Sequence, residues 1–115
     1  MRILFLGDIV GPSGCNVVKR FLPDIIKKRD LDFVVANGEN AADSGLGITE
    51  KITKELFSCG IDVLTTGNHV WDQKETAEHI EREKKLLRPY NLTSPSPGKG
   101  FEIFSIKNNF KIGVL

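Results

Sequence analysis

Short runs of apolar residues recur at a nearly even interval along the first half of the chain. They occupy residues 3–6, 33–36 and 61–64, and two threonines at 65 and 66 extend the last run. β-Branched and aromatic runs of this length are typical of strands that are buried on both faces, as in a parallel sheet. We therefore expect three parallel strands at these positions.

The segments between these runs have helical spacing. Residues 17–26 repeat apolar side chains three and four positions apart, which predicts a helix with one stripe toward the sheet. Pro23 is expected to kink this helix or to begin a second one. Thr49 is expected to cap the next helix, which Gly60 ends. A third, densely charged helix is expected over residues 73–85, with His79 at the surface.

The alternation of strands and helices predicts an α/β fold with a βαβαβ core, in which the helices cover the faces of the sheet. Residues 89–100, rich in proline and glycine, predict a loop. Residues 101–106 and 110–115 predict a closing β-hairpin, because the asparagines between them tolerate positive φ. No linker divides the chain, so one domain is expected over residues 1–115.

The composition excludes several classes of protein. The 115 residues include 16 Lys and Arg, 15 Asp and Glu, and 40% hydrophobic residues. These values are typical of a soluble globular protein rather than a disordered tail or a membrane span. A net charge of +1 gives no signal for nucleic-acid or membrane binding. Cys15 and Cys59 lack metal-binding spacing, which favours buried thiols and a cytoplasmic location.

Each predicted strand is followed by a glycine and then by polar side chains that suit chemistry. These side chains are Asp8, Glu39, Asn40, Asn68 and His69. The carboxyl ends of parallel strands share one edge of a sheet, where open α/β folds bind ligands. Two close carboxylates repel each other unless a cation or a proton neutralises them. Oxygen and imidazole donors together suit manganese, iron or zinc, so the pattern predicts a metal site.

The same residues also have purely structural interpretations. Asp8 could cap the helix that follows it, and Glu39 with Asn40 could form a turn with a solvated carboxylate. Asn68 could stabilise a turn, and His69 could be a hydrogen-bonded core histidine. These alternatives stay open at the level of sequence.

A nucleotide-binding loop is a further interpretation of the glycine-rich residues 7–14. This segment lacks both the G-x-G-x-x-G pattern and the lysine of a P-loop. Asp8 would also repel a phosphate bound there, unless a metal ion lay between them. The electrostatics therefore favour a metal site.

Three motifs resemble those of calcineurin-like metallophosphoesterases, and most closely those of their YmdB-like branch. They are G-D-I-V-G at positions 7–11, N-G-E-N-A-A at 37–42 and G-N-H-V-W-D at 67–72. Val10 stands where the wider superfamily has a histidine, and Glu39 where it has a bridging aspartate. The YmdB-like branch shares both departures, which sharpens the resemblance.

The resemblance implies a layered α/β sandwich of the metallophosphoesterase type. The family's remaining metal ligands are histidines in the second half of a longer domain, so we expect this chain to be an amino-terminal half. Asp8 would bind one metal ion and Glu39 would bridge two. Asn40 would lie at the first metal or position the phosphate, and Asn68 would bind the second metal. His69 would be the catalytic general acid or would stabilise the phosphoryl oxygens.

The activity that the resemblance implies is hydrolysis of phosphodiesters such as 2′,3′-cyclic nucleotides by a metal-bridging hydroxide. The cofactors would be two iron or manganese ions, with zinc as a further option. The expected partners are a small phosphodiester or cyclic nucleotide and, for a half-domain, a second copy or a complementary chain. Two alternatives stay open: an incomplete half-domain that acts by association, and a nucleotide-binding module in which Glu39 contacts a ribose.

Overall fold

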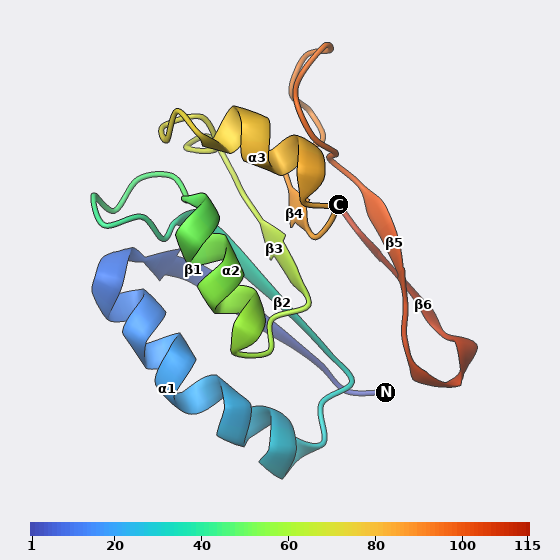
Figure 1. The fold of residues 1–115 in the computed structure, drawn as a ribbon. Helices are drawn as coiled ribbons and strands as arrows, with labels where there is room; N and C mark the ends of the chain where they lie inside the picture. Colours follow the sequence, from blue (N-terminus) through green and yellow to red (C-terminus); the bar gives the residue numbers. More distant parts are fainter.

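A parallel sheet organises the chain, of which the computed structural model describes residues 1–115 apart from the side chain of Asn108 (Figure 1). Its four strands lie in the order β1 (Ile3–Val10), β2 (Phe33–Asn40), β3 (Val63–Thr65) and β4 (Leu86–Leu87). The connecting helices are α1 (Gly11–Arg29), α2 (Glu50–Ser58) and α3 (Thr76–Arg82). A hairpin of β5 (Glu102–Ser105) and β6 (Lys111–Val114), joined by the 3₁₀ helix η1 (Lys107–Asn109), completes the fold.

The three expected strands and the closing hairpin are confirmed, and β4 is an additional short strand. Asn109 has a φ of 62°, in agreement with the expected asparagine turn. Pro23 lies inside α1, which continues through it, so the helix neither stops nor restarts there. The third helix is shorter than the sequence predicted. No helix among the described residues is long and apolar enough to cross a membrane.

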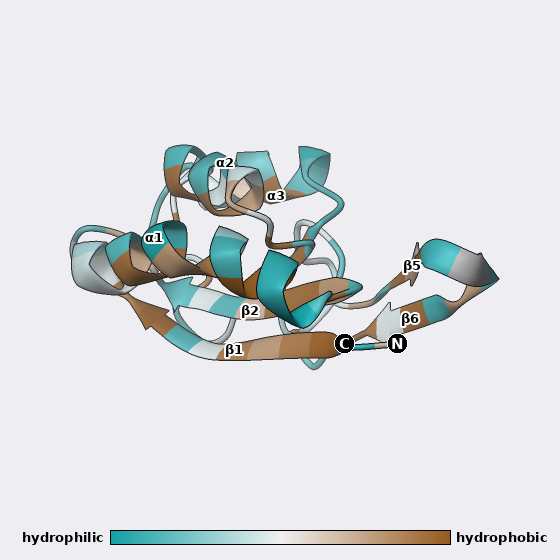
Figure 2. Cartoon of the chain, turned by 90° about the horizontal axis from the view of Figure 1, so that it is seen from below, coloured by the Kyte–Doolittle hydropathy of each residue, from teal (hydrophilic) through white to brown (hydrophobic). Residues whose placement is uncertain are grey.

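The three helices lie on one face of the sheet (Figure 2), and the hairpin packs against the other. Val34 and Ala36 belong to the helix-side core, whereas Phe33 and Val35 belong to the hairpin-side core. The expectation that helices cover both faces is therefore wrong. The strands follow one another in sequence order, so every right-handed crossover passes over the same face.

The N-terminus of α2 is capped as the sequence predicts. The Oγ1 atom of Thr49 accepts a hydrogen bond of 3.2 Å from the backbone N–H of Ile52. The hydroxyl of Thr53 donates to the carbonyl of Thr49 at 2.9 Å. The cap fixes the start of α2 directly after the loop that leaves β2.

The two cysteines are free thiols that pack as apolar side chains. Cys15 is buried and its Sγ donates to the carbonyl of Ala41 at 3.4 Å. Cys59 is half-buried and donates to the carbonyl of Leu56 at 3.0 Å. Burial raises the pKa of both thiols, which keeps them protonated and unreactive at neutral pH.

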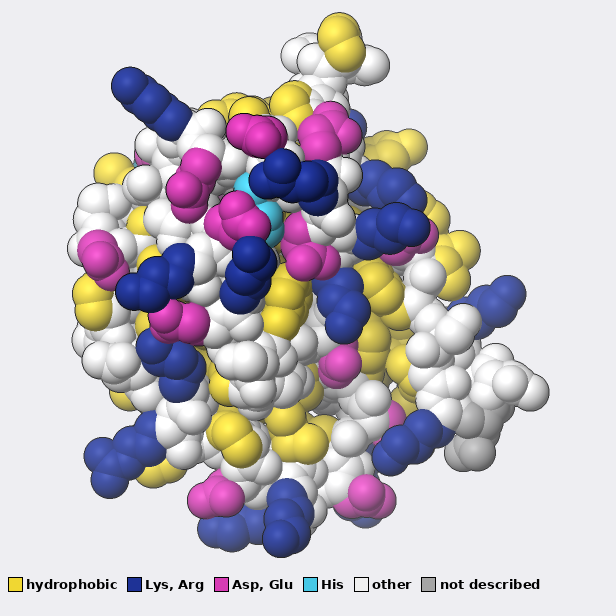
Figure 3. Space-filling view, in the orientation of Figure 1, with side chains coloured by type: hydrophobic (Ala, Val, Ile, Leu, Met, Phe, Trp, Pro, Cys, Tyr) yellow, Lys and Arg dark blue, Asp and Glu magenta, His cyan; other side chains and the backbone are white. Residues whose placement is uncertain are grey.

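His79 is buried, so the prediction that it lies at the surface is wrong. Its exposed fraction is 3%, and it shares the inner face of α3 with Thr76 and Ile80. Acidic and basic side chains gather over α2 and α3 (Figure 3). The high charge of α3 in the sequence hides a narrow inner stripe with a helical spacing of three and four residues. The Nε2 atom of His79 is buried and has no hydrogen-bond partner among the described residues.

This burial predicts a pH-dependent stability. Desolvation lowers the pKa of His79 and outweighs the nearby carboxylates of Glu50, Glu83 and Glu75. The unfolded chain, with an imidazole pKa of about 6.5, therefore binds a proton more readily than the folded chain. The free energy of unfolding is therefore independent of this group above about pH 6.5 and falls as the pH drops below that value toward the lower pKa of the folded chain.

We expect His79→Leu to flatten the acid side of the stability curve, as measured by urea unfolding over a series of pH values. Ile80→Val changes a buried side chain of the same helix that does not titrate, and should keep the slope of the unmodified chain. Equal slopes for His79→Leu and the unmodified chain would contradict the prediction.

Candidate functional site

The five candidate residues lie at the carboxyl edge of the parallel sheet. Asp8 is in β1, and Glu39 and Asn40 end β2. Asn68 and His69 lie in the turn that follows β3. Strand pairing brings the first three together, because β1 and β2 are adjacent and parallel. The sequence-based expectation of one shared edge is thus confirmed.

An irregularity at Gly7 determines which way Asp8 faces. The pairing of β1 with β2 shifts between Leu6 and Asp8, so that Asp8 lies opposite Asn37. Ile9 is buried in the helix-side core. Successive strand residues face opposite sides of a sheet, so Asp8 lies on the other face, where it is exposed. The shift has the character of a β-bulge, which commonly redirects a side chain near a functional site.

Gly38 has a similar effect in β2. A Cβ atom at this position would meet Cδ1 of Ile48 at 3.0 Å and Cδ2 of Leu64 at 3.2 Å. Gly38 therefore faces the helix-side core, and the next residue, Glu39, faces the same side as Asp8. Both acidic side chains thus lie on one face of the sheet at its carboxyl edge.

Asp8 and Asn40 are in direct contact. The Nδ2 atom of Asn40 donates a hydrogen bond of 2.8 Å to Oδ2 of Asp8. The other end of the amide, Oδ1, is buried and has no hydrogen-bond partner among the described residues. Leaving such an oxygen unpaired costs about 1–3 kcal/mol. Asp8 makes no capping hydrogen bond to α1, so the structure does not support its interpretation as a helix cap.

The carboxylate of Glu39 lies directly over Gly67. A Cβ atom at position 67 would lie 2.5 Å from Cδ and 2.6 Å from Oε1 of Glu39, closer than van der Waals contact allows. The Oε2 atom also accepts a long hydrogen bond of 3.5 Å from the backbone N–H of His69. Glu39 therefore connects the end of β2 with the turn after β3.

His69 is paired with Asp72, a residue that the sequence interpretation missed. Its Nδ1 atom lies 2.7 Å from Oδ2 of Asp72, and the two side chains are 32% and 39% exposed. The same turn contains hydrogen bonds from Val70 N–H to the Gly67 carbonyl and from Asp72 N–H to the His69 carbonyl, both 3.1 Å. The sequence does contain a signal for this pair, because a histidine and an aspartate three residues apart in a tight turn can come into contact.

Asn68 is exposed, and no side-chain hydrogen bond joins it to the other candidates among the described residues. Nor do the described residues contain a group of three or more His, Cys, Asp or Glu side chains that could hold a metal ion. Oxygen donors from Asp8, Glu39 and Asn40 nevertheless suit a hard or borderline cation. These three residues could therefore provide part, but not all, of a metal-binding set.

The largest hollow described lies elsewhere. It measures about 710 Å³ and is lined by α1, α2 and the loop that begins at Ala41, with Lys19 and Glu55 forming an ion pair of 2.7 Å across it. A second hollow of about 580 Å³ borders Asp8 and is lined by residues such as Ser13 and Val17 of α1. Only the second hollow reaches a candidate side chain.

Comparison with known proteins gives consistent matches. The sequence profile described as "YmdB-like protein" matches residues 4–115. The chain is 46% identical over 111 residues to a 2′,3′-cyclic-nucleotide 2′-phosphodiesterase of Bacillus subtilis strain 168. That match covers 96% of this chain and 41% of the relative.

Two crystal structures have the same fold. A hypothetical protein from Thermus thermophilus gives a TM-score of 0.89 at 36% identity, over 98% of this chain and 43% of that one. A phosphatase from Mycoplasma pneumoniae gives 0.87 at 34% identity, over 96% and 40%. The chain therefore spans about two fifths of the length of the proteins it matches, consistent with the partial domain expected from the sequence.

The contact between Glu39 and Gly67 leads to a test of the site's geometry. Gly67→Ala should lower the free energy of unfolding by no more than about 1 kcal/mol, because the added methyl group overlaps the Glu39 carboxylate, which is the flexible end of its side chain and can move aside. Adding Glu39→Ala should relieve most of this loss. Gly7→Ala is the control, since nothing lies within 4 Å of a Cβ atom there. Urea unfolding measures all four proteins, and an unrelieved loss in the double variant would refute the contact.

Proposed function

The chain belongs to the YmdB-like protein family, and from this membership we propose that it forms part of a metal-dependent phosphoesterase. The observation that carries the proposal is the pair of Asp8 and Asn40. The pair holds a buried amide oxygen, which has no donor within the described part of the chain, beside an ionisable carboxyl group. A metal ion would satisfy the oxygen and would be attracted by the carboxylate.

The ligands in this proposal are Asp8, Glu39 and Asn40, with Asn68 at a second ion. Glu39 is suited to the position between the two ions, because it follows β2 and also contacts the turn after β3. Iron or manganese fits these oxygen donors, and zinc is the third option. When bound, two such ions activate water and neutralise the phosphoryl oxygens.

His69 serves as the general acid for the leaving oxygen or stabilises the phosphoryl oxygens. The ring is about one third exposed, so a substrate at the sheet edge can reach it. Proton transfer by a positioned side chain typically contributes about 10²–10⁴-fold to a rate. Hydrolysis of a phosphodiester, which breaks a P–O ester bond and releases an alkoxide, is a reaction that benefits from such a donor.

The substrate class that we propose is a small phosphodiester such as a 2′,3′-cyclic nucleotide. The support is the name of the Bacillus subtilis relative, with which the chain shares 46% of its residues over the aligned region. The site motifs at positions 7–11, 37–42 and 67–72 fall within the residues that the family profile matches. We propose a cytoplasmic location for the protein, in keeping with its two free thiols.

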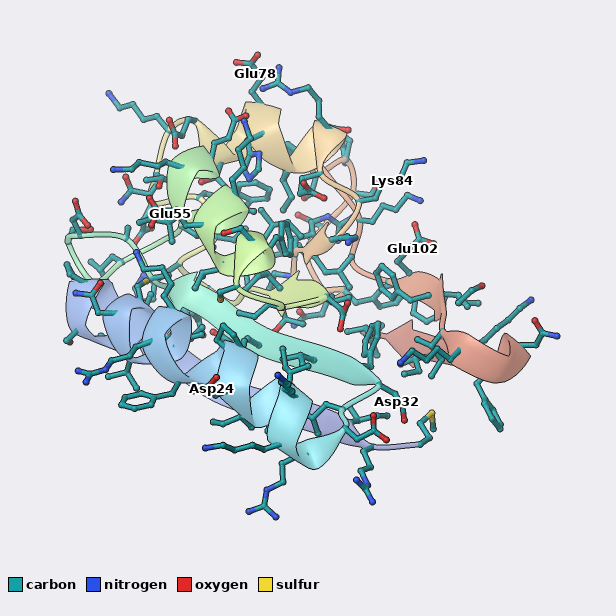
Figure 4. The ribbon with its side chains drawn as sticks, turned by 60° about the horizontal axis from the view of Figure 1, so that its bottom comes forward. Asp24, Asp32, Glu55, Glu78, Lys84 and Glu102 are labelled. Carbon is teal, nitrogen blue, oxygen red and sulfur yellow. The ribbon has the colours of Figure 1, made fainter. Side chains whose placement is uncertain are left out.

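Metal binding tests the proposal directly. We expect Mn²⁺ titration by calorimetry to show binding that Asp8→Asn and Asn40→Ala each weaken at least about 10-fold, since even indirect metal partners have effects of this size. Hydrolysis of 2′,3′-cyclic AMP with added Mn²⁺ should fall in parallel. Asp24→Asn makes the same change of charge on the exposed surface of α1 (Figure 4) and should have no effect. Unchanged Mn²⁺ affinity in both site variants would refute the assigned ligands.

A second candidate function, association with another polypeptide, is favoured by the outer face of β1. This strand lies at one edge of the sheet. Its Ile3 and Phe5 lie in register with Phe33 and Val35 of the hairpin-side core, yet they are 48% and 66% exposed. An edge strand with exposed apolar side chains tends to pair with a strand of another polypeptide. We propose that copies of this chain associate with one another through the β1 edge of the sheet.

Sedimentation velocity tests this association. The chain should sediment as dimers or larger species, and Phe5→Glu should shift it toward the monomer, because a buried charge opposes the contact. Phe21→Glu is the control, since Phe21 is 50% exposed but lies on α1. A monomer at all concentrations of the unmodified chain would exclude this candidate.

A further inference from the structure

We propose that Asp72 is a positioning residue that holds the His69 ring in one tautomer and one orientation. This inference rests on the proposed function, in which His69 acts on the phosphodiester. It assigns a role to a carboxylate that is not among the proposed metal ligands.

The contact itself determines the tautomer. The Nδ1 atom of His69 and the Oδ2 atom of Asp72 are 2.7 Å apart, the distance of a short hydrogen bond. An ionised carboxylate can only accept a hydrogen bond, so Nδ1 must carry the proton. The proton on Nδ1 leaves Nε2 as the ring nitrogen that exchanges a proton with a ligand. Without Asp72, the proton could occupy either nitrogen of the neutral ring.

The turn around the pair is anchored on both sides. Val70, which lies between His69 and Asp72 in the sequence, is 1% exposed and packs into the helix-side core. Gln73, the residue after Asp72, donates from Nε2 to the carbonyl of Leu46 at 2.8 Å. The backbone that carries both side chains is therefore fixed by the core and by the loop after β2. The ring of His69 and the carboxylate of Asp72 are therefore in contact without any change in the backbone of the turn.

Stability does not account for the pair. Both side chains are about one third exposed, and ion pairs with such exposure contribute about 0–1 kcal/mol. The main effect of the pair is on geometry, because the contact determines which ring nitrogen faces a ligand. The backbone N–H of His69 donates to Glu39 and the ring contacts Asp72, so one acidic residue holds the backbone of His69 and another holds its imidazole.

Nitrogen NMR of the histidine rings tests the tautomer without relying on catalysis. The chain has two histidines, and the spectrum of His69→Ala identifies the signals of His79. The spectra are recorded at about pH 8.5, about two units above the ordinary imidazole pKa of about 6.5, to favour neutral rings. We expect His69 to show a protonated Nδ1 and an unprotonated Nε2 in the unmodified chain. In Asp72→Asn, the proton should be distributed over both nitrogens, and Asp72→Glu should partly restore the single form.

Kinetics of 2′,3′-cyclic AMP hydrolysis with Mn²⁺ test the positioning role. Asp72→Asn should lower kcat about 10–100-fold with little change in KM, as for other residues that orient a ligand or an imidazole. In a His69→Ala background the same substitution should have no further effect, because Asp72 acts through His69. Asp24→Asn again controls for the loss of one negative charge.

The two measurements separate failure of the inference from failure of the proposed function. An unchanged His69 tautomer in Asp72→Asn would overturn the positioning role, whether or not the chain is active. A loss of kcat that persists in full in the His69→Ala background would also overturn it. The predicted tautomer shift together with no hydrolysis by any variant would uphold the Asp72 contact and reject the proposed activity.

Discussion

Burial of β2 on both faces is the constraint on which the rest of the structure depends. Val34 and Ala36 pack under the helices, whereas Phe33 and Val35 pack under the hairpin. Full burial of each large apolar side chain contributes about 1.5–3 kcal/mol. A shift of one residue in the strand would exchange the two sets between cores of different shape and would move Asp32 or Asn37 toward a buried position, so it is strongly disfavoured. The fixed register determines where β2 leaves the core. Glu39 and Asn40 are consequently held at a defined point on the edge of the sheet.

The residues at this edge lower the local stability of the fold, but they hold the polar side chains of the candidate site in defined positions. Gly38 and Gly67 provide no side chains to the core, and the space of a Cβ atom is taken by Ile48 in one case and by the Glu39 carboxylate in the other. Asn40 keeps a buried oxygen without a hydrogen-bond partner among the described residues. Features of this kind are costly in a folded protein and are found where a ligand compensates for them. The apolar residues of β2 supply the stability that tolerates them.

The sequence predicted those features that depend on near neighbours in the chain. The apolar runs indicated three of the parallel strands, Thr49 indicated a helix cap, and the glycines indicated the strand ends. It could not show that all helices share one face, because this depends on the order of strands in the sheet. The burial of His79 depends on how α3 packs onto the rest of the fold, and the charged residues around it concealed the inner stripe. The two-residue strand β4 is too short to produce a periodic pattern.

The candidate site combines both kinds of information. Asp8, Asn40 and Glu39 come together through strand pairing, a long-range effect that the sequence predicted only as a shared edge. His69 and Asp72 come together through a single turn, a contact between residues three apart in the sequence. The pair of His69 and Asp72 therefore forms with the turn after β3, whereas the cluster of Asp8, Glu39 and Asn40 requires the sheet. Because Glu39 contacts Gly67 and the His69 backbone, it is the side chain through which the geometry of one part constrains the other.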